Sequence, residues 1–89
     1  SSIVPDDGNY AELLSIAVLP NASNKGIGHS LLREFEKKMK SMGVSKVVLT
    51  TDSISNDNVI NFYQKNDFKV LYKFVTYPKR EMYKLIKEL

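Results

Sequence analysis

The stretch that decides the fold is residues 13–32, which read LLSIAVLPNASNKGIGHSLL. An apolar run is ended by Pro20, and a loop of small and polar residues then leads through Gly26 and Gly28 into an amphipathic pattern. This order predicts a strand, a glycine loop and a helix. The first turn of a helix has backbone N–H groups without partners, and the positive end of the helix dipole lies there. The junction therefore favours an anion such as a phosphate group.

The sequence of the loop argues against two common kinds of nucleotide-binding site. Gly26-Ile27-Gly28 lacks the third glycine of the dinucleotide fingerprint, and the chain has no Gly-Lys-Ser/Thr of a P-loop. Lys25 adds positive charge beside the glycines, although a solvated loop charge explains it as well. The two glycines have a structural alternative too, since glycines also shape strand-to-helix turns.

The order of residues in this stretch resembles the acetyl-coenzyme A loop of the GNAT N-acetyltransferase superfamily. That family has Val-x-Pro, a few variable residues, Gln/Arg-x-x-Gly-x-Gly/Ala and then a helix. Here Val18-Leu19-Pro20 precedes Ser23-Asn24-Lys25-Gly26-Ile27-Gly28 and Leu31-Leu32. Ser23 is the departure, because the family usually has Gln or Arg at that position.

A second stretch resembles another motif of the same family, Asn-x-x-Ala-x-x-Phe-Tyr-x-Lys-x-Gly-Phe. This chain has the matching spacing, with departures at Val59 and Asp67; the seven residues are Asn56, Val59, Phe62, Tyr63, Lys65, Asp67 and Phe68. Two motifs in the same order carry more weight than a lone Gly-x-Gly.

Hydrophobic periodicity predicts an α/β fold with a mixed sheet and β-α-β-α-β-β order, similar to the second half of the GNAT fold. A helix from Ile27 is ended by Gly43, and a short helix from Val59 ends near Asn66. Phe68, Val70, Tyr72 and Phe74 alternate, which predicts one shared strand face. The predicted strands are Tyr10 to Leu19, Lys46 to Thr51, Phe68 to Tyr77 and about Glu81 to Ile86.

Composition indicates one small domain over residues 1–89. The chain is 43% hydrophobic and 26% charged, with a net charge of +3, and it contains no cysteine. Disulfide and thiolate chemistry are therefore excluded, and no apolar run approaches the roughly 20 residues of a membrane span. We expect a cytoplasmic protein without a membrane segment or a metal. No start methionine precedes Ser1, and the resemblance implies that the family's N-terminal strands and helices are missing.

The resemblance implies how acetyl-coenzyme A binds. The strands Glu12 to Val18 and Lys46 to Thr51 are parallel neighbours that splay apart, so that the backbone of Ile16, Ala17 and Val18 pairs with the pantetheine arm. The N–H of Ile16 polarises the thioester carbonyl. The phosphate-binding loop comprises Ser23, Asn24, Lys25, Gly26, Ile27, Gly28 and the backbone of His29.

The resemblance also implies catalytic residues. Tyr63 is the candidate that protonates the departing thiolate, and a core aromatic residue is the structural alternative. Glu12 lies six residues before Val18. The histone-acetyltransferase branch of the family has the glutamate that acts as general base at this position. A glutamate in a strand is also typical of a solvated edge. Other branches use an acidic residue on the following strand, where this chain has Thr51 with Asp52 adjacent. Asn56 is a cofactor contact or a helix N-cap.

The chain thus resembles an N-acetyltransferase that depends on acetyl-coenzyme A. The resemblance implies direct transfer of the acetyl group in a ternary complex, and the acceptor is a small-molecule or peptide amine. A non-catalytic coenzyme A-binding or regulatory module is the first alternative. A nucleic-acid-binding domain is a weaker alternative. Its surface would have Tyr72 or Tyr77 as stacking platforms and the basic residues Lys65, Lys69, Lys73, Lys79 and Arg80. The open edge of the strand from Tyr10 to Leu19 predicts a homodimer or pairing with another chain.

Overall fold

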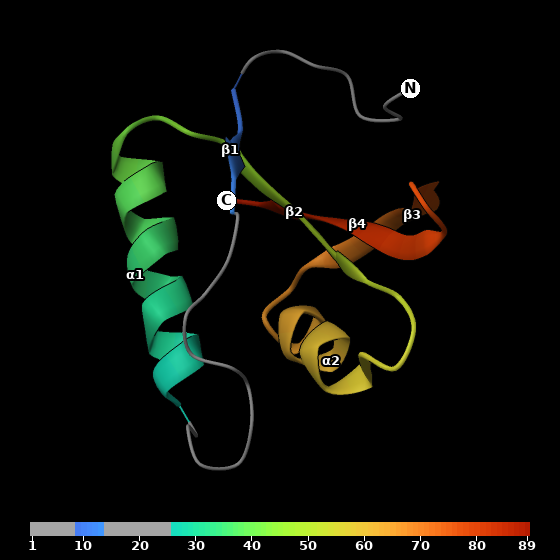
Figure 1. The fold of residues 1–89 in the computed structure, drawn as a ribbon. Coiled ribbons are helices and arrows are strands. Elements are labelled where there is room, and N and C mark those ends of the chain that lie inside the picture. Colours follow the sequence, from blue (N-terminus) through green and yellow to red (C-terminus); the bar gives the residue numbers. More distant parts are fainter. Residues whose placement is uncertain (1–8, 14–25) are drawn as a thin grey trace.

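The computed structural model describes residues 9–13 and 26–89. Within them the elements are β1 (Ala11–Glu12), α1 (Ile27–Ser41), β2 (Lys46–Asp52), α2 (Asp57–Lys65), β3 (Lys69–Thr76) and β4 (Arg80–Glu88) (Figure 1). This succession confirms the predicted α/β class and element order. None of the described helices is long and apolar enough to span a membrane.

The sheet is mixed, with strand order β1-β2-β4-β3. β1 pairs in parallel with β2, and Glu12 lies opposite Val48. The N–H of Leu13 extends this pairing by donating to the carbonyl of Val48 at 2.8 Å. β4 is antiparallel to both β2 and β3, so the closing hairpin is joined to the sheet through its second strand.

The ends of α1 follow from glycine conformation. Gly26 is its N-cap with φ of 81°, and Gly43 follows the helix with φ of 84°. Both values lie in the left-handed region that glycine adopts without strain. The predicted end at Gly43 is therefore confirmed. α2 begins at Asp57, two residues before the predicted Val59, because the N–H of Ile60 already bonds to the carbonyl of Asn56.

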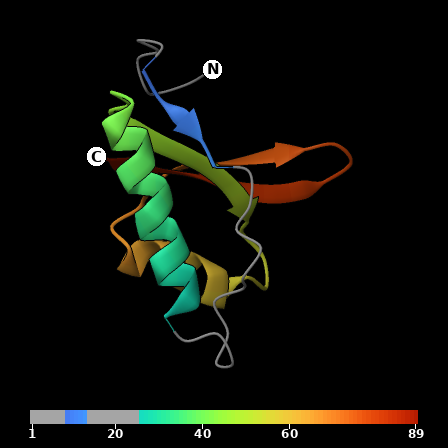
Figure 2. The ribbon, with the colours of Figure 1, turned by 90° about the vertical axis from the view of Figure 1, so that its left-hand side faces the viewer.

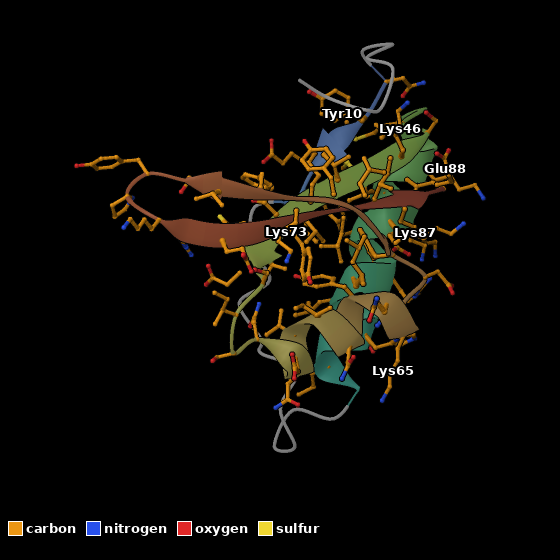
Figure 3. The ribbon with its side chains drawn as sticks, turned by 90° about the vertical axis from the view of Figure 1, so that its right-hand side faces the viewer. Tyr10, Lys46, Lys65, Lys73, Lys87 and Glu88 are labelled. Atoms are coloured by element: carbon orange, nitrogen blue, oxygen red, sulfur yellow. The ribbon has the colours of Figure 1, made fainter. Side chains whose placement is uncertain are left out.

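Both helices pack on one face of the sheet, as Figures 2 and 3 show. Leu32 of α1 and Leu85 of β4 are fully buried at the centre of this layer. The buried cluster contains residues from both helices and from β2 and β4; its members are Leu13, Leu32, Val47, Leu49, Tyr63, Phe68 and Leu85. Side chains alternate along a strand, so Val48 and Glu12 lie on the face away from the helices.

The predicted single face of β3 is wrong. Val70 lies opposite Leu85 but Tyr72 lies opposite Lys84, so Leu71 is an extra residue in β3. Such a bulge shifts the alternation by one residue. Tyr72 and Phe74 consequently lie on the face away from the helices, where their rings meet edge to face at 5.9 Å.

Two neighbouring leucines of α1 test this packing. Leu32 is fully buried, whereas Leu31 is 45% exposed. Replacing Leu32 with Ala is expected to lower the free energy of unfolding by about 2–5 kcal/mol, because a cavity forms in the core. Leu31→Ala, with the same change in helix propensity, is expected to cost less than about 1 kcal/mol. Urea denaturation measures both, and equal losses would contradict the placement of α1.

Candidate active site

The N-terminus of α1 lacks a counter-charge among the described residues. Its N-cap makes no side-chain hydrogen bond, and its first turn contains no acidic residue. α2, in contrast, has Asp57 in its first turn. Among the described residues, a Cβ on Gly26 would meet no atom within 4 Å. The positive end of α1 is therefore available to an anion that comes from outside the protein.

Four of the predicted phosphate-binding residues are described, and they lie together at this helix end: Gly26, Ile27, Gly28 and His29. The N–H of Ser30 bonds to the carbonyl of Gly26 at 2.9 Å, which closes the first turn. Asn56 is described as well, and the remaining predicted cofactor contacts lie outside the described residues; they are Ile16, Ala17, Val18, Ser23, Asn24 and Lys25. The predicted splay of the first strand lies there too.

The ring of His29 has a structural contact that the sequence did not reveal. Its Nδ1 lies 2.7 Å from Oδ1 of Asn66, and Arg33 Nη2 donates to the same oxygen at 3.0 Å. Asn66 is only 4% exposed. It was missed because it is a variable position of the second motif, and its partners are 33 and 37 residues away in the sequence.

Tyr63 lies in the hydrophobic core and is 8% exposed. Its ring meets those of Phe62 and Phe68 edge to face, at 5.3 and 5.4 Å. Burial raises the pKa of its hydroxyl above the usual value. The hydroxyl therefore stays protonated at physiological pH, the form that can donate a proton.

Asn56 occupies the N-cap position of α2 without making a side-chain cap bond. Its Nδ2 donates instead to Thr51 Oγ1 and to the carbonyl of Asp52, each at 2.8 Å. The capping alternative is therefore wrong for its side chain. Asn56 ties the loop before α2 to the end of β2.

The two acidic candidates differ in their partners. Asp52 accepts hydrogen bonds from Arg80 Nε at 2.6 Å and from Nη2 at 3.2 Å. The hydrogen bond from Arg80 holds the pKa of Asp52 below its usual value, which makes Asp52 a weak base. Glu12 is exposed on the face of the sheet away from Tyr63. The two carboxylates therefore differ in that Asp52 is paired with Arg80 and Glu12 is exposed.

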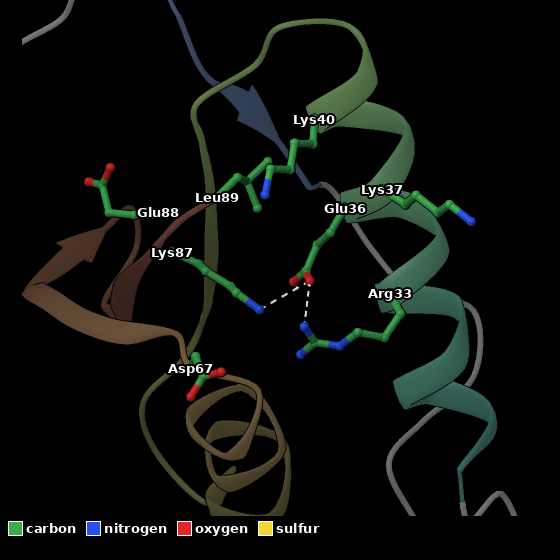
Figure 4. A pocket seen from close by; sticks show the side chains of 8 residues that line it. All are labelled: Arg33, Glu36, Lys37, Lys40, Asp67, Lys87, Glu88 and Leu89. Atoms are coloured by element: carbon green, nitrogen blue, oxygen red, sulfur yellow. Dashed lines mark hydrogen bonds and ion pairs between the residues drawn. The ribbon is translucent and has the colours of Figure 1, made fainter.

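A buried ion pair lies further along α1. Lys87 Nζ and Arg33 Nη1 both contact Glu36 Oε1, at 3.0 and 2.9 Å (Figure 4). Glu36 and Lys87 are 7% and 8% exposed. A hollow of about 460 Å³ borders this pair; it is lined by Arg33, Glu36, Lys37, Lys40, Asp67, Lys87, Glu88 and Leu89. In the part of the chain that the structure describes, no group of His, Cys, Asp and Glu could hold a metal ion.

The basic residues considered for nucleic acid do not form one surface. Lys73 pairs with Glu81 at 3.7 Å, and Arg80 pairs with Asp52. The bulge in β3 places Lys69 opposite Ile86 and Lys73 opposite Tyr83, and these two partners lie on different faces of the sheet. The geometry therefore gives no continuous basic groove.

Comparison with known proteins identifies the family. Residues 1–68 match the acetyltransferase (GNAT) family. The chain therefore belongs to the GNAT family of acetyltransferases. It is 42% identical over 62 residues to spermidine N(1)-acetyltransferase of Thermoplasma acidophilum, a match that covers 70% of this chain and 38% of that protein. The chain thus spans well under half the length of this curated relative.

Solved structures give the same family and fold. A GNAT acetyltransferase from Elizabethkingia anophelis with bound acetyl-CoA has a TM-score of 0.75 and 28% identity, over 96% of this chain and 64% of that one. The PaiA N-acetyltransferase of Thermoplasma acidophilum in complex with coenzyme A has a TM-score of 0.69 and 33% identity, over 91% and 47%.

The Asp52–Arg80 pair predicts a specific titration. The carboxyl group of Asp52 is expected to titrate below the usual aspartate value of about 3.9. Arg80→Gln is expected to return the midpoint toward that value, because the largest cause of the lowered pKa is lost. The stabilisation by the pair is present above the unfolded-state pKa and disappears as the pH falls through the folded-state pKa. Carboxyl NMR measures the midpoint, and a value unmoved by Arg80→Gln would contradict the pairing.

Proposed function

We propose that this chain provides the acetyl-coenzyme A-binding part of an N-acetyltransferase, which moves an acetyl group to an amine in a ternary complex. The observation that carries the proposal is the N-terminus of α1, which has a left-handed glycine at the N-cap and no acidic residue in its first turn. Backbone N–H groups of Gly26, Ile27 and Gly28 bind the diphosphate. Family relatives crystallised with acetyl-CoA or coenzyme A support this role.

Each predicted residue has a place in this binding mode. Ser23, Asn24 and Lys25 continue the phosphate loop before Gly26, and His29 contributes its backbone. The backbone of Ile16, Ala17 and Val18 pairs with the pantetheine arm, and the Ile16 N–H polarises the thioester carbonyl. Asn56 reaches the cofactor through its side-chain oxygen, because its NH₂ group is occupied by Thr51 and Asp52.

The reaction needs one proton acceptor and one proton donor. Acetyl-CoA supplies the acetyl group as a thioester. The amine nitrogen forms the new C–N bond and loses a proton to Glu12, directly or through water. The C–S bond breaks, and Tyr63 donates its hydroxyl proton to the sulfur. The raised pKa of Tyr63 keeps it in the donating form.

A coenzyme A-binding module without catalysis is the second candidate. The burial of Tyr63 against Phe62 and Phe68 favours it, because a core aromatic residue needs no catalytic role. The acceptor is an amine in the first candidate; the relative from Thermoplasma acidophilum is named for spermidine. β1 is an edge of the described sheet, and we propose that the rest of the protein or a second copy pairs there.

Substitution of Gly26 tests the phosphate site. Gly26→Asp is expected to weaken acetyl-CoA binding at least about tenfold, because a carboxylate would face the diphosphate. Gly26→Asn has nearly the same size and the same tolerance of left-handed backbone without the charge, so the difference between the two variants isolates electrostatics. Gly43→Asp is the control at the other end of α1, where φ is 84°. Calorimetric titration with acetyl-CoA measures all three, and equal affinities would place the phosphates elsewhere.

Tyr63→Phe separates the enzyme from the binding module. The change keeps the ring, so stability is expected to fall by no more than about 0.5–1.5 kcal/mol. Turnover at saturating acetyl-CoA is expected to fall by about 10²-fold if the hydroxyl protonates the departing sulfur. Tyr72→Phe, on the opposite face of the sheet, is the control and is expected to keep full turnover. Wild-type turnover in Tyr63→Phe, with chemistry rate-limiting, would remove Tyr63 from the mechanism.

A further inference from the structure

The buried side chain of Asn66 links the two helices of the described fold through hydrogen bonds. It is the C-cap residue of α2, and its backbone N–H bonds to the carbonyl of Tyr63 at 3.0 Å. Its side chain extends across to α1, where it meets His29 in the first turn and Arg33 one turn later. Asn66 therefore contacts both the helix end that carries the glycines and the turn that carries Tyr63.

The orientation of the Asn66 amide follows from its partners. Nδ2 donates to the carbonyl of Phe62 at 2.8 Å, so Oδ1 must face α1. Arg33 offers only donors to this oxygen, and a flipped amide would set NH₂ against guanidinium. His29 must then donate from Nδ1 as well. The network thus fixes one ring tautomer of His29, with Nδ1 protonated.

We infer that Asn66 is a positioning residue, which holds the first turn of α1 at a set distance from Tyr63. This inference rests on the proposed function. A cofactor bound by its diphosphate at Gly26–Gly28 brings its sulfur to Tyr63 only if these two points keep their separation. Displacement of reacting groups by about 1 Å can lower a rate by about 10²-fold. Asn66 acts on the reaction through Tyr63 and does not itself touch the reacting atoms.

A structural role alone would make a different prediction. Loss of the Asn66 oxygen removes the acceptor of Arg33 Nη2, but Arg33 is partly exposed and its Nη1 still pairs with Glu36, and His29 is exposed. Asn66→Leu is therefore expected to fold. Asn66→Asp retains an acceptor for His29 and Arg33. Asn61→Leu, at an exposed position of the same helix, is the control for the change of side chain.

The test measures kcat and KM for acetyl-CoA in the full-length protein. Asn66→Leu is expected to lower kcat by about ten- to a hundredfold with less than about threefold change in KM, and Asn66→Asp to restore kcat to within about threefold. In a Tyr63→Phe background, Asn66→Leu is expected to lower kcat by less than about twofold, since the group it positions is gone. Asn61→Leu is expected to match wild type.

Two kinetic results would overturn the inference. In the first, Asn66→Leu lowers the melting temperature but leaves kcat at the wild-type value. In the second, Asn66→Leu lowers kcat by the same factor in the wild-type and in the Tyr63→Phe background. A readout independent of activity is ¹⁵N NMR of the His29 ring, which is expected to show the Nδ1-protonated tautomer in wild type but not in Asn66→Leu. The opposite tautomer in wild type would also overturn it. Failure of the wild-type protein to bind acetyl-CoA or to form acetylated product would instead reject the proposed function.

Discussion

The position of α1 depends on one carboxylate oxygen. Along this helix the buried residues are Gly28, Leu32 and Glu36, four residues apart, so its apolar contact is narrow. Glu36 Oε1 accepts hydrogen bonds from both Lys87 and Arg33. Removing one partner of a buried ion pair costs about 3–5 kcal/mol, which is comparable to the loss of a buried leucine. This cost is the penalty of leaving a charge buried without a partner, so the intact pair fixes where α1 lies against β4.

The same polar contacts continue toward the glycine end of the helix. Arg33 links Glu36 to Asn66, and Asn66 links to His29, so a continuous network joins β4, α1 and α2. Hydrophobic contacts have little directional preference, whereas hydrogen bonds fix both distance and angle. Apolar contact at Leu32 alone defines the rotation and the axial position of α1 less strictly than hydrogen bonds do. The network removes that freedom, and the open N–H groups at Gly26 acquire a defined direction.

Local patterns in the sequence predicted the elements well, for a physical reason. Helix periodicity and the glycine stop at Gly43 depend on residues within a few positions of one another. The two motifs are also local, and Gly26 lies at the N-cap of α1 and Tyr63 lies within α2. The bulge at Leu71 was not predictable, because no glycine or proline marks it and the register of β4 decides it.

Contacts between distant side chains explain the remaining differences. The Lys87–Glu36 pair and the Asn66–His29 bond join residues 51 and 37 positions apart, and neither has a pattern that periodicity detects. The partner of Asp52 is also distant in the sequence, so its position in the sequence alone left it as a candidate base. Only the arrangement of β4 brings Arg80 against it and lowers its pKa.

The register of β1 constrains how the proposed reaction takes place. Glu12 lies opposite Val48, on the face of the sheet away from the helices, whereas Tyr63 belongs to the core on the helix face. A proton acceptor and a proton donor on opposite faces can serve one thioester only where two strands separate. In the proposed reaction the amine therefore approaches from the Glu12 face, and the sulfur departs toward Tyr63 on the other.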